Sequence, residues 1–326
     1  MTDTTKERLA YSVGGLLYVP ALKEGLADKI AAGKLPDLMS LAFCLEDSIA
    51  DRSVGRAEKV LVHTFDELAA ISPKLPLVFV RVRSPEHLSH LHRLLAPYTA
   101  VITGYVLPKF DLSNAAAYLT RAEEINSTAE RKIYIMPTLE THSVADIAHR
   151  RTALTELSAM LAAHKNIILN IRVGANDFCR LYGLRRGIGQ TIYDIGVVRE
   201  ILTDILTVFL PDYVVSGPVW EYFGSVGKAW EKGLERELEL DLANGFCGKT
   251  AIHPSQLPVI RRALRVSAAD YADACQILDW TAADLGVQKS SAGGRMNEVK
   301  CHRRWAGRIK LLGDIYGVKS DGEEKP

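Results

Sequence analysis

The feature that most constrains the fold is a short apolar run that recurs along the chain and ends each time in charged residues. The clearest example is Ile167–Phe178 (IILNIRVGANDF), a β-branched run with no helical period that stops at Gly174 and carries Asp177. Such a run is typical of a buried strand whose C-terminal end opens into a loop. Four further runs share the pattern: Phe43–Asp47, Leu77–Arg83, Tyr105–Lys109 and Ile133–Glu140. Strands that carry charges at the same end predict a site assembled there.

Strand-like and helix-like segments alternate along the chain. Eight alternations lie between residues 14 and 266, counting the further strand-like segments Gly15–Pro20, Tyr213–Val215 and Thr250–Ile252. Eight such units with buried strands favour a closed (β/α)8 TIM barrel of the α/β class, in which the active site lies at the C-terminal ends of the strands. An open, doubly wound sheet is the alternative, but no GxGxxG segment of the kind that binds dinucleotides follows any strand.

The length predicts one large domain with an appendage. The chain has 326 residues, and α/β barrels commonly occupy about 200–250 residues as one unit. We expect residues 1–266 to form the barrel with a short N-terminal arm, and residues 267–326 to form a helical extension ending in a disordered tail, SDGEEKP. The apolar residues Trp280, Trp305, Ile309 and Leu312 of the extension need a surface to bury. We expect its helices to pack on the barrel mouth or on a neighbouring subunit.

The charge composition is balanced, since 40 Lys and Arg residues against 39 Asp and Glu leave a formal charge of +1. This gives no electrostatic reason to expect nucleic acid or an anionic membrane as a partner, although a local site for a small anionic metabolite stays open. The five cysteines form no CxxC pair, so neither a disulfide framework nor a zinc knuckle is indicated. The polar first residues lack a signal-peptide core, and no stretch reaches about 18 uncharged apolar residues. We therefore expect a cytoplasmic protein without a membrane span.

Glu140 and Asp177 end the fifth and sixth strands and are candidate metal ligands. Neighbouring strands lie ~5 Å apart, so the two carboxylates could share one ion. Oxygen ligands without nearby His or Cys suit Mg²⁺ or Mn²⁺, which typically take one or two protein carboxylates and complete their shell with water or substrate oxygens. The alternative is that each acid caps a loop or pairs with an arginine, and spacing alone leaves both open.

Two further pairs of charges end the second and third strands. Glu46 and Asp47 are adjacent, so an extended strand would point them in opposite directions and at most one would face the mouth directly. One of them could position a metal-bound water or a basic residue, while helix capping is the alternative for Asp47. Arg81 and Arg83 share a face, and a guanidinium there suits capture of a carboxylate or stabilisation of an enolate oxygen. A salt bridge to Glu46 or Asp47 is the alternative for both arginines.

Three other features have weaker functional interpretations. Lys109 could be a Schiff-base nucleophile if burial lowered its pKa, but the nearby acids favour a protonated electrostatic partner. His253 could serve as an acid or base, or be bonded to the turn that Pro254 fixes. The loop Leu184–Gln190 (LRRGIGQ) could hold an anion or be an ordinary solvated loop.

Over roughly residues 14 to 266 the chain resembles the citrate lyase beta subunit and malyl-CoA lyase family, within the metal-dependent pyruvate-type aldolases. The segments that carry the resemblance are LYVPALKEGLADKI at the first strand, CLEDSIADRSVGRA at the second, VRVR at the third, VLPK at the fourth, LET at the fifth, GANDF at the sixth and GFCGKTAIHPSQ at the eighth. Each is weak by itself, but their order and spacing are specific.

The resemblance implies a homotrimeric or related oligomeric barrel enzyme that cleaves or forms a carbon–carbon bond through a Mg²⁺-bound enolate. By position, it implies Glu140 and Asp177 as the metal ligands and Arg81 as the clamp on substrate and enolate oxygen. Glu46 and Asp47 would be a supporting acidic pair. Lys29 falls where many relatives have a lysine near the cofactor tail.

The chain also departs from that family's pattern. Ala21 follows Pro20 where relatives usually have glycine, Arg83 stands where they usually have asparagine, and Thr141-His142 follow the fifth-strand acid. These changes indicate a divergent subgroup, weigh against a CoA thioester as the substrate, and suggest a more anionic or phosphorylated one.

Two classes of function follow. The first is a Mg²⁺-dependent carbon–carbon lyase or aldolase that acts on a small oxoacid, hydroxyacid or acyl thioester, with Arg81, Arg83, Lys109 and Lys29 as candidate substrate-binding residues. The second is a repurposed barrel that binds an anionic or phosphorylated metabolite as a subunit of a larger complex. The combination of Glu140, Asp177 and Arg81 favours the enzyme, because a pure binding protein has no need of paired carboxylates opposite an arginine.

Overall fold

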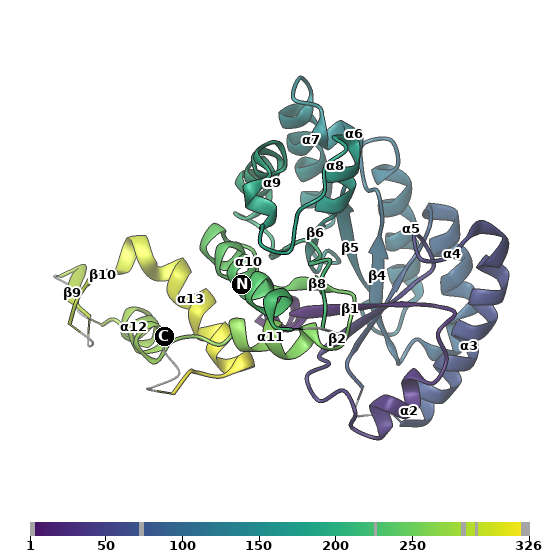
Figure 1. Ribbon diagram of the computed structural model, residues 1–326, viewed down its shortest axis with the longest axis horizontal. Coiled ribbons are helices and arrows are strands. Elements are labelled where there is room, and N and C mark those ends of the chain that lie inside the picture. Colours follow the sequence, from purple (N-terminus) through teal and green to yellow (C-terminus); the bar gives the residue numbers. More distant parts are fainter. Residues whose placement is uncertain (1–3, 72–74, 225–226, 282–284, 291–292, 321–326) are drawn as a thin grey trace. The chain divides into compact units, whose positions relative to one another are not determined.

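The computed structural model describes residues 4–71, 75–224, 227–281, 285–290 and 293–320 (Figure 1). The chain forms two compact units. The larger runs from Val13 to Ile260, and the smaller combines the segment up to Ser12 with the segment from Arg261 onward. The predicted domain boundary at residue 266 stays a prediction, and the tail expected to be disordered lies, beyond Ser320, outside the described residues.

The larger unit is built on a parallel eight-stranded sheet in the order β7-β6-β5-β4-β3-β2-β1-β8. The ring closes between β7 and β8 through an isolated parallel bridge from Gly217 to Lys249. The predicted (β/α)8 barrel is therefore confirmed. The strands are β1 Gly15–Pro20, β2 Ser40–Cys44, β3 Leu77–Arg81, β4 Ile102–Leu107, β5 Tyr134–Leu139, β6 Ile171–Val173, β7 Val215–Ser216 and β8 Lys249–Ala251.

Helices follow the strands and surround the sheet (Figure 1). Local chemistry explains several boundaries: the Ser84 side chain accepts a hydrogen bond from His87 N, and Pro85 then occupies the first turn of α4, as predicted. The left-handed Gly245 (φ 107°) ends α10. The α-helices of this unit are α2 Leu26–Ala31, α3 Val54–Ile71, α4 Pro85–Leu94, α5 Ala115–Thr128, α6 His142–Ala145, α7 Arg150–Ala163, α8 Ala175–Leu181, α9 Gly196–Phe209 and α10 Ala229–Asn244, with 3₁₀ turns at Asp51–Ser53, Ala96–Tyr98 and Ile192–Asp194. The next helix, α11 Gln256–Ala263, begins in this unit and ends past its boundary at Ile260.

Two predicted elements differ in the structure: one helix is interrupted and one strand is shorter. The helix expected over residues 144–164 is interrupted at Asp146, whose carboxylate accepts from Ala148 N at 3.0 Å and contacts the His149 ring at 2.7 Å. Such local bonds compete with helical ones. The sixth strand forms a ladder only at Ile171–Val173, and the run before it is held by a single bridge between Ile135 and Ile168.

Sheet register pairs polar residues across neighbouring strands. Cys44 pairs with Arg81 across β2 and β3, and Thr138 pairs with Arg172 across β5 and β6. Strands β2 and β4 are buried along their whole lengths, as expected for a sheet covered on both faces. The polar side chains at the strand ends are therefore supported by strands that are fully buried.

The smaller unit contains α1 Thr4–Ser12, α12 Ala268–Leu278, the hairpin of β9 Val287–Lys289 and β10 Met296–Glu298, and α13 Val299–Tyr316. A cluster of Ala274, Ile277 and Ala306 joins α12 to α13, and Trp305 and Ile309 pack against it. These two large side chains thus find apolar partners within the extension itself. The helix expected from Met296 begins three residues later, because Met296–Glu298 pair with β9.

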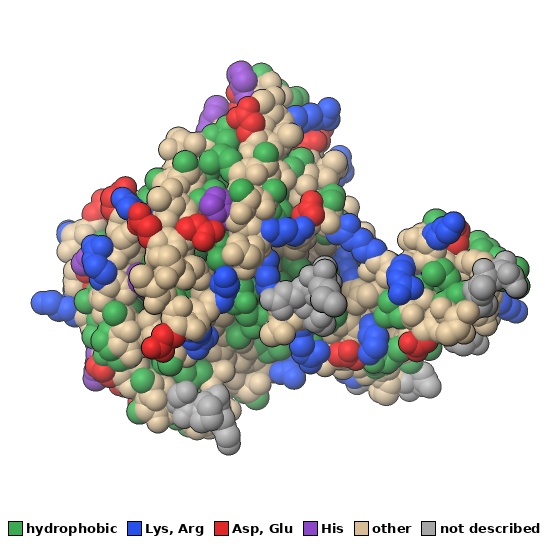
Figure 2. Space-filling view, turned by 180° about the vertical axis from the view of Figure 1, so that it is seen from behind, with side chains coloured by type: hydrophobic (Ala, Val, Ile, Leu, Met, Phe, Trp, Pro, Cys, Tyr) green, Lys and Arg blue, Asp and Glu red, His purple; other side chains and the backbone are tan. Residues whose placement is uncertain are grey.

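No helix in the described part of the chain is long and apolar enough to cross a membrane. On the face of the larger unit drawn in Figure 2, acidic and basic side chains are interspersed, in keeping with 40 basic and 39 acidic residues.

Gly104 allows β4 and β5 to approach closely, because a Cβ at this position would lie 2.1 Å from Tyr134 O. We expect Gly104→Ala to lower the free energy of unfolding by about 1–3 kcal/mol, as overpacking does. Gly55→Ala in α3 is the matched control, since a Cβ there meets nothing within 4 Å and should stabilise the helix by up to about 1 kcal/mol. Urea unfolding measures both. Equal stability of Gly104→Ala and wild type would contradict this approach of the two strands.

Candidate active site

Arg81, the last residue of β3, binds three carboxylates at the C-terminal end of the barrel. Its Nη1 lies 3.0 Å from Glu46 Oε2 and 2.9 Å from Asp47 Oδ2, and its Nη2 lies 2.9 Å from Glu140 Oε1. The side chains of Arg81 and Glu140 are only 6% and 3% exposed. Arg81 thus forms the salt bridges to Glu46 and Asp47 that were the alternative to a functional role, and it also contacts Glu140, the predicted metal ligand.

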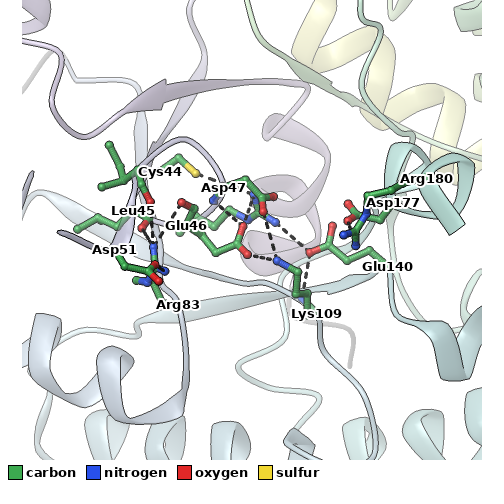
Figure 3. Close-up of polar contacts among 12 residues, drawn as sticks. Cys44, Leu45, Glu46, Asp47, Asp51, Arg83, Lys109, Glu140, Asp177 and Arg180 are labelled. Atoms are coloured by element: carbon green, nitrogen blue, oxygen red, sulfur yellow. Dashed lines mark hydrogen bonds and ion pairs between the residues drawn. The ribbon is translucent and has the colours of Figure 1, made fainter. Parts of the chain in front are cut away.

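Lys109 adds a second cation to this cluster (Figure 3). Its Nζ pairs with Glu46 and lies 3.2 Å from Asp47 Oδ1, while its backbone N donates to Glu140 Oε1 at 2.9 Å. Among the residues that the structure describes, it is the one non-glycine residue with positive φ (47°), and Asn114 Nδ2 holds its carbonyl oxygen at 2.8 Å. Strained backbone of this kind concentrates at functional sites.

The environment of Lys109 favours the charged form. Burial alone would lower the pKa of the amine, but the hydrogen bond to Glu46 and the negative charges of Glu46 and Asp47 raise it overall. A Schiff-base nucleophile needs a neutral amine. The structure therefore supports the interpretation of Lys109 as an electrostatic partner.

Glu46 and Asp47 both reach the cluster, which corrects the expectation that at most one of them would face the mouth. Strand β2 ends at Cys44, so the two acids lie in a turn where strand alternation no longer applies. Burial, followed by the hydrogen bond with Asp47, raises the pKa of Glu46. Burial acts in the same direction on Asp47, but the bond with Glu46 and the charges of Arg81 and Lys109 outweigh it and hold the pKa of Asp47 below its usual range.

Glu140 and Asp177 lie on the side of the cluster away from Glu46 (Figure 3). Burial raises the pKa of Glu140 to about 7 against the pull of Arg81, and the charge of Asp177 contributes to the rise. Asp177 lies in the first turn of α8 rather than in a loop, and pairs with Arg180 Nη2 at 3.1 Å. Gly174 leaves room for the Glu140 carboxylate, because a Cβ there would lie 2.1 Å from its Oε2.

These two acids fit a hard divalent cation. Glu140 keeps a raised pKa despite its bonds to Arg81 and Lys109, so additional positive charge near it would be favourable. No group of three or more His, Cys, Asp or Glu within the described ranges is arranged to hold a metal. A cation here would therefore use two carboxylates and complete its shell with water or substrate oxygens, as Mg²⁺ commonly does.

Arg83 and Lys29 lie outside this cluster. Arg83 Nη1 donates to Leu45 O at 2.9 Å and Ile49 O at 3.2 Å, and its Nη2 pairs with Asp51, so Arg83 holds the loop that carries the acidic pair. Lys29 is exposed on α2. Their roles as substrate-binding residues stay predictions.

The other two candidates are occupied by structural contacts. His253 Nδ1 lies 2.9 Å from Ser255 Oγ and its ring stacks on Phe223, so it belongs to the turn before α11. In the loop Leu184–Gln190, Arg186 is buried and its Nη1 lies 2.7 Å from Glu237 Oε2. That arginine serves a buried ion pair rather than a solvated anion site.

Sequence reasoning missed polar residues inside the barrel. Tyr18 of β1 lies under Arg81, whose Cζ is 5.7 Å from the ring centroid, and Arg172 of β6 is 1% exposed. The run around Ile171 was treated as apolar, although Asn170 and Arg172 stand two residues apart in it. That spacing puts both side chains on one face of the strand and was the available signal.

Removal of Arg81 should leave three acids with much of their charge uncompensated. We expect Arg81→Met to lower the free energy of unfolding by about 3–5 kcal/mol, as for a buried ion pair that loses one partner. Arg121→Met is the control, because Arg121 and Glu124 are 43% and 56% exposed and such pairs contribute less than about 1 kcal/mol.

The deficit of Arg81→Met should also grow with pH. The pKa of Glu140 is raised to about 7 in the folded protein. Its ionisation therefore lowers the free energy of unfolding as pH rises from the pKa of Glu140 in the unfolded chain to its pKa in the folded protein. Without Arg81 the folded pKa rises further, so the loss continues above pH 7 in the variant only. Urea unfolding at pH 6 and pH 8.5 measures this, and a deficit that is independent of pH or equal to that of Arg121→Met would contradict the ion-pair account.

Comparison with solved structures finds the same fold. The CitE protein of Mycobacterium tuberculosis, in a complex with magnesium, acetoacetate and coenzyme A, is similar at a TM-score of 0.61 and 21% identity, over 92% of this chain and 98% of that one. The citrate lyase beta subunit of M. tuberculosis with oxaloacetate and magnesium gives a TM-score of 0.53 at 21% identity, over 78% and 98%. RipC of Yersinia pestis gives 0.56 at 17% identity, over 80% and 99%.

A search of curated proteins finds no match. The family of C–C bond lyases of the TIM-barrel fold, in contrast, matches residues 7–318. This match spans nearly the whole chain, including both compact units. The protein therefore belongs to the C–C bond lyase family of the TIM-barrel fold.

Proposed function

We propose that this protein is a Mg²⁺-dependent carbon–carbon lyase that acts through an enolate on a small oxoacid, hydroxyacid or acyl thioester. The observation that carries the proposal is the position of Arg81, which is buried at the mouth of the barrel in contact with Glu140. The charge of Asp177 in turn raises the pKa of Glu140. Membership of a C–C bond lyase family supports the reaction class. The magnesium and small oxoacids named in the structures of M. tuberculosis CitE support the choice of metal and substrate class.

Glu140 and Asp177 would hold the metal. Bound there, Mg²⁺ would offset negative charge on substrate oxygens. The buried Glu140 presents Oε1 to Arg81 and Lys109, and its Oε2 faces Gly174. The lysine and arginine thereby fix the orientation of the carboxylate.

Arg81 would stabilise the charge that bond cleavage creates. Heterolysis of a carbon–carbon bond next to a carbonyl leaves the electron pair on that fragment, and most of the charge resides on its oxygen. Glu46, Asp47 and Glu140 hold the guanidinium in place before any substrate arrives. A fixed charge of this kind stabilises a transition state without reorganisation.

Glu46 and Asp47 would take part in the proton transfer that accompanies cleavage of the carbon–carbon bond. The two neighbours have pKa values shifted in opposite directions, upward for Glu46 and downward for Asp47. Pairs separated in this way commonly divide acid and base roles. We assign this proton to Glu46, whose carboxylate would take the hydroxyl proton of one fragment as its C–O bond becomes a carbonyl and return it to the carbon of the enolate fragment.

The substrate would contact Arg81 and Lys109 with its anionic groups. We keep Lys29 and Arg83 as contacts for the outer part of a larger substrate such as a CoA thioester, and Arg83 would have to leave Leu45, Ile49 and Asp51 to make one. Assembly as a homo-oligomer, a trimer or a multiple of it, is part of the proposal.

Glu140→Gln and Asp177→Asn should each abolish Mg²⁺ binding measured by calorimetry, because each removes one of two anionic ligands. Asp212→Asn is the matched control, since Asp212 pairs with Lys165 and is 56% exposed. Unchanged Mg²⁺ affinity in both site variants would place the metal elsewhere.

Arg81→Ala should lower turnover about a hundredfold or more while Mg²⁺ affinity changes little, because it removes a donor to the enolate oxygen. Arg81→Lys should recover only part of that loss, because lysine keeps the charge but loses the planar fork. Activity is measured with Mg²⁺ on oxoacids, hydroxyacids and acyl-CoA thioesters, by release of pyruvate, glyoxylate or acetyl-CoA. Turnover within about twofold of wild type would remove Arg81 from this role. Binding of Mg²⁺ and an oxoacid without cleavage of any substrate would instead support a repurposed, metabolite-binding barrel.

A further inference from the structure

A second polar layer lies inside the barrel, one level below the charged cluster. Thr138 precedes Glu140 by two residues, so both side chains are on the same face of β5. Thr138 pairs in register with Arg172 on β6, and Tyr18 lies two residues beyond Leu16, which pairs with Thr250 on β8. These side chains therefore share the interior of the barrel.

Arg172 has no charge partner in this layer. It is 1% exposed, and its hydrogen bond from Nη2 to Thr250 Oγ1 (2.7 Å) leaves Nε and Nη1 without a partner. Among the described residues, no carboxylate pairs with Arg172. Burial lowers the pKa of Arg172, and the charge of Arg81 adds to that effect. The charge of the Tyr18 hydroxyl and a side-chain hydrogen bond with it act in the opposite direction, but Tyr18 is no carboxylate and leaves Nε and Nη1 unpartnered.

Other buried arginines of this unit are paired. Arg81 binds Glu140, Arg186 binds Glu237 and Arg150 binds Asp204, at 2.9, 2.7 and 3.1 Å. This agrees with the rule that buried charges are paired. Arg172 is the exception that needs an explanation.

The unpartnered atoms around Arg172 are mostly donors. Arg81 Nε and Thr138 Oγ1 also lack a partner, as do both amide atoms of Asn170. Ordered water could satisfy the neutral groups. Water alone cannot neutralise a buried guanidinium, whereas a carboxylate would both accept these hydrogen bonds and pair with the charge.

We propose that Arg172, together with Thr138, binds a carboxylate of the substrate inside the barrel and so selects substrates with a second carboxylate beyond the one that Arg81 and Lys109 would contact. This proposal rests on the proposed lyase function and adds a substrate class to it. Arg172 is thus a specificity residue, and the protein acts on dicarboxylates.

The stability of the ligand-free protein separates a ligand site from a structural role. Arg172→Met removes an unpaired buried charge at similar length, so the variant should melt at or above the wild-type temperature. Arg150→Met is the matched control, because Arg150 pairs with Asp204 and donates to two carbonyl groups, and it should melt several degrees lower. An Arg172→Met variant that melts as low as this control, or does not fold, overturns the proposal.

Ligand binding tests the specificity directly, by calorimetry in the presence of MgCl₂ with two pairs that differ by one carboxylate. These are lactate and malate, each as both enantiomers, and pyruvate and oxaloacetate. Wild type should bind a dicarboxylate about tenfold or more tighter than its monocarboxylate partner. Arg172→Met should lose this preference while monocarboxylate affinity stays within about twofold, Arg172→Lys should retain part of it, and the exposed-residue control Arg56→Met should keep it.

The outcomes distinguish this proposal from the function it rests on. Equal affinity of wild type for the members of each pair, or an undiminished preference in Arg172→Met, overturns the role of Arg172 and leaves the lyase proposal intact. Failure of wild type to bind any of the four acids overturns the proposed function and this assignment with it.

Discussion

The structure of the site depends on one buried guanidinium. Arg81 joins Glu46 and Asp47, which follow β2, to Glu140, which follows β5, so a single side chain at the end of β3 connects acids from both of its sides. At 6% exposure of Arg81, solvent screens these pairs little, and each partner removed would leave charge in a poorly solvated place. Lys109 reinforces the arrangement with its ammonium and with its backbone N–H. The cluster is therefore fixed before any ligand binds, which is the condition for electrostatic catalysis.

The barrel fold brings these charged residues together and supports them. Parallel strands deliver their C-terminal residues to one end, and the fully buried strands β2 and β4 provide a rigid apolar base below them. Glu140 marks the limit of the arrangement, since its pKa of about 7 shows that two donors do not fully offset burial and the charge of Asp177. Arg172 shows the opposite imbalance one layer below, with positive charge that lacks an acid. Both imbalances are of the kind that a cation and an anionic substrate would relieve together.

Much of the fold and part of the site could be predicted from the sequence. Apolar runs ending in charge identified the strands, and parallel strand ends necessarily brought Arg81, Glu140 and Glu46 to the same mouth. The rest depended on contacts that a single sequence does not show. Asp146 interrupts a helix through its own side-chain bonds, and Asp47 faces the site because β2 stops three residues before it. For Arg81, a salt bridge and a catalytic role were alternatives on sequence grounds. In the structure, its salt bridges hold it in a position suited to catalysis. Arg172 was not recognised from the sequence as a polar residue of the barrel interior, because its neighbours Ile171 and Val173 are apolar.

A crystal structure of the protein with Mg²⁺ and pyruvate tests the central claim most directly. The account predicts one Mg²⁺ bound by both Glu140 and Asp177 at about 2.1 Å, with the oxoacid completing its coordination and one ligand oxygen in contact with Arg81. Mg²⁺ bound away from these residues, or Glu140 and Asp177 carboxylates more than about 8 Å apart with Mg²⁺ present, too far to share one octahedral ion, would contradict it.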